Sequence, residues 1–396
     1  MTVHFDPYDH DTHDNPYPVY RALRDEAPLY YAEPYKVWVL SRYADCSRAL
    51  RDFKTFTNGQ GTAVDVAKEQ MPTVLDSDPP THTRLRHLMS GMFTPEAVQP
   101  LEQVVRDMAL DLLTPHVANG QLDIIGDFAA RLPMAIICKL LGFPREDEDM
   151  VRRWTDLVLQ RDEAATEMPQ HAVDATLKLF EYFERLMTER AGRPARDDLV
   201  GHLMASEKEG KLSHQEVLGY LYILSIAGNE TTTKLIGNIT YQLHRHPDQR
   251  ALLLNDMAML PAAIEETLRF DGPTQQMART VGRDVEMHGR TLKPGDRITM
   301  LFISANRDER HYQNAELFDI RRNPRDHLAF GGGLHSCLGA ALARLEAKVA
   351  MQEILRLMPD FRVDEAGLKR MHSPAVRGYT HVPVEFTPSH GVRLSA

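Results

Sequence analysis

The stretch from Ser213 to His246 constrains the fold more than any other part of the sequence. It opens with Ser213 and, three residues later, Glu216, which is the spacing of a capping box that starts a helix. The apolar residues that follow predict one helix spanning roughly 50 Å at about 1.5 Å per residue. Because this helix is apolar on nearly all sides, it is expected to run through the middle of a large protein.

The elements on either side predict a fold that is mainly α-helical with small β-sheets, in an α+β arrangement. Short strands are expected at 36–41 and around 382–386, and a strand, turn and strand at 284–303 with the turn at 293–296. Helices are expected near 19–25, from 81 to 190 with breaks at Pro95, Gly120 and 142–144, at 261–270 and at 338–358. Helices thus fill the middle of the chain, and strands lie near both ends.

Charge and composition exclude several classes of protein. A net charge of −10 over 396 residues gives no bulk electrostatic support for a nucleic-acid partner. The N-terminus lacks the basic start and apolar run of a signal peptide, and no later apolar run reaches the roughly 18 residues of a membrane span. We therefore expect no membrane anchor and a cytoplasmic location. Three cysteines, of which Cys46 and Cys138 are typical of small buried side chains, argue against a disulfide framework.

The third cysteine, Cys337, lies in the stretch FGGGLHSCLG, residues 330–339, directly before a strong helix former. A thioredoxin-type site requires a second cysteine three residues away, and a zinc site requires more ligands than His335 and Cys337. A cysteine hydrolase requires a base that is close in space, which the sequence alone leaves open. The fourth interpretation is an axial thiolate on haem iron.

Physical chemistry favours the axial thiolate. The start of the helix at Leu338 supplies free N–H groups and the positive end of a dipole, and both stabilise a negative sulfur. The glycines around the cysteine let the backbone lie close to the sulfur and to a flat macrocycle. A glycine-rich turn that merely happens to contain a cysteine remains the alternative.

Residues 330–339 resemble the haem-binding signature of the cytochrome P450 family, Phe-Gly-x-Gly-x-His-x-Cys-x-Gly, at every fixed position. The resemblance implies that Cys337 is the proximal iron ligand, that Phe330 packs near its sulfur, and that His335 approaches a haem propionate. Gly331 and Gly339 belong to the same cofactor site. The resemblance runs from about Asn15 to Phe386 and is closest to soluble bacterial members of the family. It implies one domain over residues 1–396, folded as a helix-rich triangular prism around a buried haem b.

The middle of the long helix, AGNETTT at residues 227–233, contains a soft point. Glycine and consecutive β-branched residues weaken a helix, and threonine hydroxyls can bond back to carbonyls one turn earlier. An incidental kink is one interpretation, and a groove that admits oxygen and water is the other. The stretch is similar to the oxygen-activation motif of the same family, which implies that Thr231 holds the oxygen ligand, that Glu230 helps to deliver protons, and that Ala227 lies against the cofactor.

Two further segments carry charge. Glu266 and Arg269 lie on one helix face, a spacing common on solvated surfaces, but the family resemblance implies a structural ion pair with Arg322 as a third member. His82 and Arg86, four residues apart, also share a face and suit a carboxylate. Here the resemblance implies that they bind the haem propionates together with Arg279.

The substrate pocket is the part of the site that the sequence predicts least well. By resemblance, its walls include the loop 57–71, the helices between Val151 and Arg190, and five single residues: Ile223, Gln275, Gln276, Met277 and Val376. Most of these positions are apolar, so a hydrophobic small molecule is expected, such as a lipid, terpenoid, steroid or polyketide. The glutamines would either orient a polar group of the substrate or simply satisfy local backbone.

The resemblance implies a monooxygenase that inserts one oxygen atom of O₂ into a C–H bond or an alkene. No flavin or iron–sulfur module is expected on this chain, so a ferredoxin and its reductase would supply electrons. Its docking face would surround Cys337, where His87, Arg344 and Lys348 could meet an acidic ferredoxin. A peroxide-using or oxidative-coupling haem-thiolate enzyme and a non-catalytic haem sensor are the alternatives.

Overall fold

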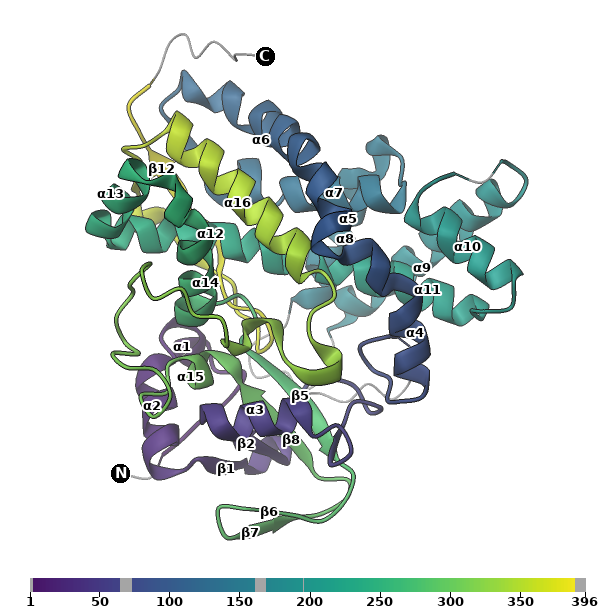
Figure 1. The fold of residues 1–396 in the computed structure, drawn as a ribbon, viewed down its shortest axis with the longest axis vertical. Helices are drawn as coiled ribbons and strands as arrows, with labels where there is room; N and C mark the ends of the chain where they lie inside the picture. Colours follow the sequence, from purple (N-terminus) through teal and green to yellow (C-terminus); the bar gives the residue numbers. More distant parts are fainter. Residues whose placement is uncertain (1–2, 65–72, 161–168, 195, 389–396) are drawn as a thin grey trace.

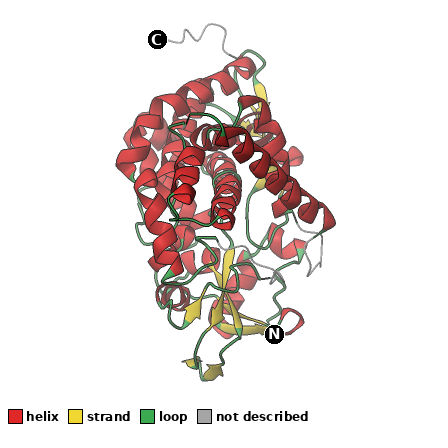
Figure 2. Cartoon of the chain, turned by 90° about the vertical axis from the view of Figure 1, so that its right-hand side faces the viewer, coloured by secondary structure: helices red, strands yellow, loops and turns green. Residues whose placement is uncertain are grey.

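The computed structural model of the protein describes residues 3–64, 73–160, 169–194 and 196–388. Figure 2 shows helices filling most of the molecule, the largest group of strands in its lower part and a few short strands among the helices above. The mainly helical α+β fold that the sequence predicts is therefore confirmed.

The largest sheet has five strands in the order β1-β2-β8-β5-β3. Its strands are β1 (Leu29–Ala32), β2 (Val37–Leu40), β8 (Arg297–Leu301), β5 (Gln276–Val281) and β3 (Phe56–Thr57). Only β2 and β8 pair in parallel, and the other neighbours are antiparallel. Short helices lie against this sheet (Figure 1), namely α2 (Tyr17–Glu26), α3 (Tyr43–Arg51) and α15 (Phe302–Asn306).

The predicted strand at 36–41 is β2. The region 284–303, predicted as a strand, a turn and a strand, contains three strands. It contains a hairpin, β6 (Val285–Met287) with β7 (Arg290–Leu292), before the chain enters β8. The predicted turn at 293–296 lies between β7 and β8, where the Asp296 N–H donates to the Lys293 carbonyl. Two small sheets complete the strands: β4 (Gln121–Asp123), β12 (Pro383–Glu385) and β9 (Arg362–Val363) in one, and β10 (Lys369–Arg370) with β11 (Tyr379–His381) in the other.

The helical part is built from long helices and several short ones. The longer ones are α4 (Thr81–Ser90), α6 (Glu102–Val117), α7 (Leu132–Leu141), α8 (Glu148–Leu159), α9 (Gln170–Ala191), α10 (Leu199–Lys208), α13 (Pro247–Asn255), α14 (Leu260–Asp271) and α16 (Ala340–Leu357). The short helices α1 (His10–Asp14) and α5 (Pro95–Val98) and the π-helical turn Ile124–Ala129 lie between other elements. The predicted interruptions at Pro95, Gly120 and 142–144 all fall at element boundaries.

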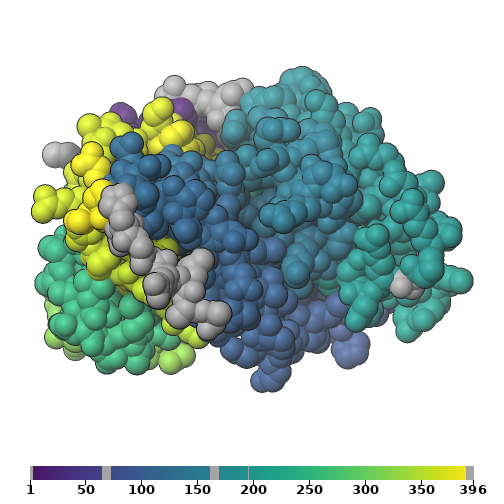
Figure 3. Space-filling view, turned by 90° about the horizontal axis from the view of Figure 1, so that it is seen from above, coloured from purple at the N-terminus to yellow at the C-terminus, as the bar shows by residue number. Residues whose placement is uncertain are grey.

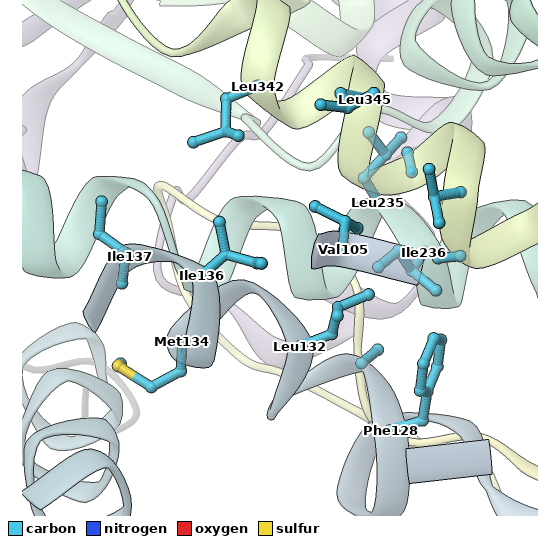
Figure 4. Close-up of a cluster of buried hydrophobic side chains, with 14 of the residues drawn as sticks. Val105, Phe128, Leu132, Met134, Ile136, Ile137, Leu235, Ile236, Leu342 and Leu345 are labelled. Carbon is cyan, nitrogen blue, oxygen red and sulfur yellow. The ribbon is translucent and has the colours of Figure 1, made fainter. Parts of the chain in front are cut away.

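A single apolar cluster holds the helical part together. Figure 4 shows it at the meeting point of α6, α7, α16 and a central helix, with the labelled side chains Val105, Phe128, Leu132, Met134, Ile136, Ile137, Leu235, Ile236, Leu342 and Leu345 pointing towards one another. Figure 3 shows the yellow C-terminal part of the chain lying beside the blue residues of α6. Burial of these side chains removes apolar surface from water and fixes α16 against the core.

The central helix is two helices rather than the single one that the sequence predicts. Its capping box is present, because the Ser213 hydroxyl accepts from the Glu216 N–H and the Glu216 carboxylate accepts from the Ser213 N–H. The helix α11 (His214–Ala227) ends at Gly228, and α12 (Glu230–Arg245) begins after Asn229. The weakness that the sequence predicts in this helix is thus large enough to end one helix and start another.

The pair Glu266 and Arg269 is fully buried in α14, not on a solvated surface. Two parallel bonds of 2.8 Å join the guanidinium to the carboxylate, and Arg322 Nε lies 3.3 Å from Glu266 Oε1 as a third member. Arg269 also donates to the carbonyl of Asn306, and the side-chain oxygen of Asn306 accepts from the Leu328 N–H at 2.7 Å. This chain of bonds fixes the start of the segment that leads into the Cys337 loop.

Candidate functional site

The loop from Leu328 to Gly339 presents Cys337 directly before α16. Gly331 has φ 70° and ψ −147°, a conformation that is essentially confined to glycine. Gly333 has φ 64°, and a Cβ added there would lie 2.5 Å from the Leu50 carbonyl at the end of α3. The loop is closed by the Cys337 N–H, which donates to the Phe330 carbonyl at 2.9 Å. Glycine is therefore required both for the backbone turn and for the close approach of α3.

The Cys337 thiol combines surface accessibility with close surroundings of protein. The residue is exposed by accessible surface, yet enough protein surrounds the thiol that burial raises its pKa. The Gly339 N–H and the charges of Arg86 and Arg344 oppose this rise. A thiol with a raised pKa becomes a thiolate when a metal ion displaces its proton, and this donor set suits an axial thiolate ligand.

Beside the loop, two histidine rings meet, and three of their nitrogens have no hydrogen-bond partner among the residues that the structure describes. The rings of His82 on α4 and His335 lie 4.1 Å apart, centroid to centroid. Both ring nitrogens of His82 and Nε2 of His335 are buried and unpartnered. Burial, followed by the neighbouring His82, Arg279 and Arg86, lowers the pKa of His335 to about 3. Neutral imidazoles with free nitrogens are ready to donate to an acceptor that the chain itself does not supply.

Two arginines join these histidines. Arg279 on β5 is buried, donates to the neighbouring Ala278 carbonyl, and has a pKa that burial lowers to about 10. Arg86 donates to the Ser336 hydroxyl at 3.3 Å, and burial lowers its pKa as well. Neither guanidinium forms an ion pair with a residue in the described ranges. One buried and one half-buried cation, together with two imidazoles that have unpartnered nitrogens, suit a ligand with carboxylates, so these residues fit the propionates of a haem.

The second predicted part of the site is the break between α11 and α12. Ala227 is exposed and Thr231 is partly exposed, although most residues of the two helices around them are buried. The Thr231 hydroxyl donates to the Ala227 carbonyl at 2.9 Å, the back-bond expected of threonine at a weak point. Glu230 instead points into protein, where its carboxylate lies 3.0 Å from Lys234 Nζ. The two residues of the predicted proton relay therefore face different surroundings.

The predicted pocket residues divide into two groups. Gln275, Met277 and Arg279 alternate along one face of the strand, and Gln276 lies on the opposite face, where its Oε1 accepts from the Thr299 hydroxyl. Gln276 is therefore directed away from the side that carries Arg279. Gln275 donates to the carbonyls of Ser373 and Pro374, and its Oε1 is buried without a partner.

The other predicted walls lie around these strands. Val376 is buried and bridges to Thr274, and Ile223 is half-buried on α11. Residues 65–71 of the predicted loop wall and 161–168 of the predicted helical wall lie outside the described residues.

Several contacts of the site were not predicted. Lys234 lies four residues after Glu230, a spacing that signals an ion pair on any helix, but no role was assigned to it. Arg344, predicted as a docking residue, has its guanidinium 4.4 Å from the Phe330 ring centroid and bonds to Glu265 at 2.6 and 2.8 Å. Although burial opposes it, the bonds from Arg344 and His327 hold the pKa of Glu265 at about 2.

Known proteins resemble this chain over most of its length. The family model described as Cytochrome P450 matches residues 8–373. A putative cytochrome P450 123 of Mycobacterium tuberculosis is 39% identical over 386 residues, covering 96% of each chain. The crystal structure of CYP109E1 from Bacillus megaterium in complex with testosterone is 31% identical, with a TM-score of 0.90 over 95% of this chain and 99% of that one. The myxobacterial CYP267B1 in complex with myristic acid is 32% identical, with a TM-score of 0.88 over 97% and 99%.

The glycine at position 333 provides a test of the loop. Gly333→Ala forces a Cβ to within 2.5 Å of the Leu50 carbonyl in a left-handed conformation, so we expect a loss of at least about 2 kcal/mol in the free energy of unfolding. Denaturant unfolding measures it. Gly91→Ala is the control, because a Cβ there meets nothing within 4 Å, and its stability should match or slightly exceed the wild type. Equal stability of the two variants would contradict the close approach.

Proposed function

The chain belongs to the cytochrome P450 family, and from that premise we propose that it inserts one oxygen atom of O₂ into a hydrophobic small molecule, by hydroxylation or epoxidation, with electrons from a separate ferredoxin and its reductase. The observation that carries the proposal is the presence of two features in one chain. One is an isolated thiol beside an unsatisfied donor cluster, and the other is a threonine hydroxyl and a buried carboxylate at a helix break.

Haem b is the cofactor that these residues would hold. Cys337 would supply the axial sulfur, and His82, Arg86, Arg279 and His335 would bind the propionates, as their unpartnered nitrogens and unpaired guanidinium groups support. Phe330, Gly331 and Gly339 would form the proximal floor, and Ala227 would lie against the opposite face. When bound, a haem with a thiolate ligand supplies the electron density that favours cleavage of the O–O bond.

In the proposed mechanism, Thr231 and Glu230 at the helix break control the delivery of protons. The Thr231 hydroxyl donates a hydrogen bond to the Ala227 carbonyl, so its oxygen is free to accept a hydrogen bond from another group. Glu230 is buried at 7% side-chain exposure and is adjacent in sequence to Thr231. In the proposed mechanism Glu230 holds a proton and Thr231 passes it onward, so that the reduced oxygen leaves as water.

The substrate class follows from the apolar walls and from the relatives. CYP109E1 and CYP267B1 were solved with testosterone and with myristic acid, both largely apolar molecules. Ile223, Met277 and Val376 offer apolar surface here, and the free Gln275 Oε1 offers a buried acceptor. We therefore propose a lipid, terpenoid, steroid or polyketide substrate with a hydroxyl or amide donor that bonds to Gln275.

The electron donor would dock on the side of Cys337. Arg344 and Lys348 are 42% and 33% exposed, but each is already paired, with Glu265 and with Glu102. Leu334, three residues before Cys337, is an exposed apolar residue. An acidic ferredoxin would therefore contact the apolar Leu334 and two cations, Arg344 and Lys348, whose charges are partly neutralised by their ion pairs.

The iron ligand is tested by Cys337→Ser. The hydroxyl is a much weaker donor than a thiolate, so the reduced carbon monoxide complex should lose its red-shifted absorption band while the protein stays folded. Difference spectroscopy and circular dichroism measure the two properties. A variant that keeps the band would contradict the assignment of Cys337.

The proton relay is tested by Thr231→Ala. We expect the variant to bind haem but to release hydrogen peroxide in place of much of the product, measured as product formed per electron pair consumed. Thr240→Ala is the matched control, since Thr240 makes the same back-bond on α12, to Ile236 at 2.9 Å, but is fully buried. Unchanged coupling in Thr231→Ala, or equal leakage in Thr240→Ala, would rule the role out.

The docking face is tested by reversing charge in the double variant Arg344→Glu and Lys348→Glu. Electron transfer from an acidic ferredoxin should slow, and its rate should depend less on salt, because the attractive charges are gone. Lys208→Glu, on the distant helix α10, should leave both properties unchanged. A double variant that behaves as the wild type would exclude this face.

A further inference from the structure

A cleft of about 520 Å³ opens between the C-terminal end of α9 and the side of α10. Figure 1 shows α10 at the edge of the molecule. None of the described residues that line the cleft belongs to the cofactor or proton-relay residues described above. The volume falls within the roughly 300–1,000 Å³ of small-molecule sites in proteins. The cleft is therefore large enough for a ligand of its own.

Part of the surface of this cleft is apolar. Leu186 of α9, Met204 of α10 and Pro144, which lies between α7 and α8, all line it. Leu186 is buried, and the other two are half-buried. An apolar chain that lay on these side chains would remove its own surface and theirs from water. This part of the cleft thus favours a ligand with an apolar tail.

Three arginines line the same cleft, and one of them is neutralised. Arg190 donates to both carboxylate oxygens of Asp198, at 2.8 and 3.0 Å. Arg193 and Arg196 are exposed, and neither side chain forms an ion pair or a hydrogen bond within the described part of the chain. Two guanidinium groups therefore remain for a ligand.

The two acids that line the cleft, Glu189 and Glu207, have partners outside it. Glu207 Oε1 lies 2.9 Å from His214 Nδ1, and Glu189 Oε1 lies 3.9 Å from Arg185 Nε. Neither acid pairs with the two free arginines, although the protein as a whole carries a net charge of −10. The positive charge of the cleft is thus available to an anion.

Backbone contacts fix the connection that carries the two free arginines. At its start, the Arg193 N–H donates to the Arg190 carbonyl at 3.0 Å. At its end, Asp198 caps α10 by accepting from the Gly201 N–H at 2.9 Å, and a Cβ added at Gly201 would collide with the Arg196 carbonyl. Because both ends of the connection are held, the arginines stay beside the cleft when their side chains move.

We propose that the cleft between α9 and α10 is a second binding site, which takes an amphipathic oxyanion with an apolar chain and a carboxylate or phosphate head. The chain would lie against Leu186 and Met204. The head would bind Arg193 and Arg196, because guanidinium groups bond such oxyanions in bidentate fashion. A small inorganic anion would leave the apolar surface uncovered, and a neutral molecule would leave the arginines unpaired. The site shares no residue with the proposed oxygenation and does not depend on it.

Titration of the haem-containing protein with decanoate and with decyl phosphate tests the site. Calorimetry counts all bound ligand, whereas the haem absorption spectrum reports only ligand in the substrate pocket. We expect at least one of the two probes to bind at a site that leaves the spectrum unchanged, and the tighter probe identifies the head group. Affinity at this silent site should fall with added salt and rise from hexanoate to decanoate. Decanol, which has the same chain without the charge, should bind there more weakly by about tenfold or more.

The double variant Arg193→Glu and Arg196→Glu assigns the silent site to the cleft. It should weaken binding there by about tenfold or more and leave the spectral titration unchanged. The matched control is the double variant Arg362→Glu and Lys369→Glu, which makes the same change in net charge at exposed positions on β9 and β10. It should bind both probes as the wild type does.

Four results would overturn the proposal: no spectrally silent binding of either probe, equal binding of decanol, equal affinity for hexanoate and decanoate, or unchanged affinity in the arginine double variant. Equal weakening in the control double variant would also overturn it, because net charge alone would then explain the binding. A failure of the proposed oxygenation is separate, since it appears in the product analysis and leaves the silent site in place.

Discussion

The buried bond between Glu266 and Arg269 is the interaction on which the rest of the structure depends. Neither side chain has any exposure, and the guanidinium also binds the carbonyls of Asn306 and Ala315. A buried charge that loses its partner costs roughly 3–5 kcal/mol, so neither residue can change alone. Through Asn306 and the Leu328 N–H, this bond sets where the Cys337 loop begins.

The two parts of the site, the Cys337 loop and the helix break, differ in rigidity. The loop side is rigid, since Gly331 and Gly333 adopt backbone angles that few residues accept and α3 presses against it. The helix side is weakened at Gly228 and Asn229, where α11 gives way to α12. A fixed sulfur in combination with an adaptable backbone suits the proposed site, which would hold one group permanently and admit others in turn.

Much of the candidate site was predictable from the sequence because its residues lie in short, contiguous stretches. The cysteine loop, the capping box at Ser213 and the pair His82 and Arg86 are local patterns with fixed spacing. The helix break was predicted as a soft point only, because propensity gives the weakness of a helix but not whether packing overcomes it. The direction of Gln276 was predictable in principle, since strand alternation places it opposite its neighbours once Arg279 is placed inward.

Contacts between segments that are remote in the sequence could not be predicted from the sequence. Nothing in the sequence joins Leu50 to Gly333, because this contact is made by the packing of α3 against the Cys337 loop. The contact of Lys234 with Gly378, where an added Cβ would lie 2.6 Å from Lys234 Cβ, is of the same kind, and it restricts evolutionary change. A relative that carries any side chain at the position of Gly378 has to shorten or redirect the residue at the position of Lys234. The two positions should therefore covary in size, although 144 residues separate them (378 minus 234).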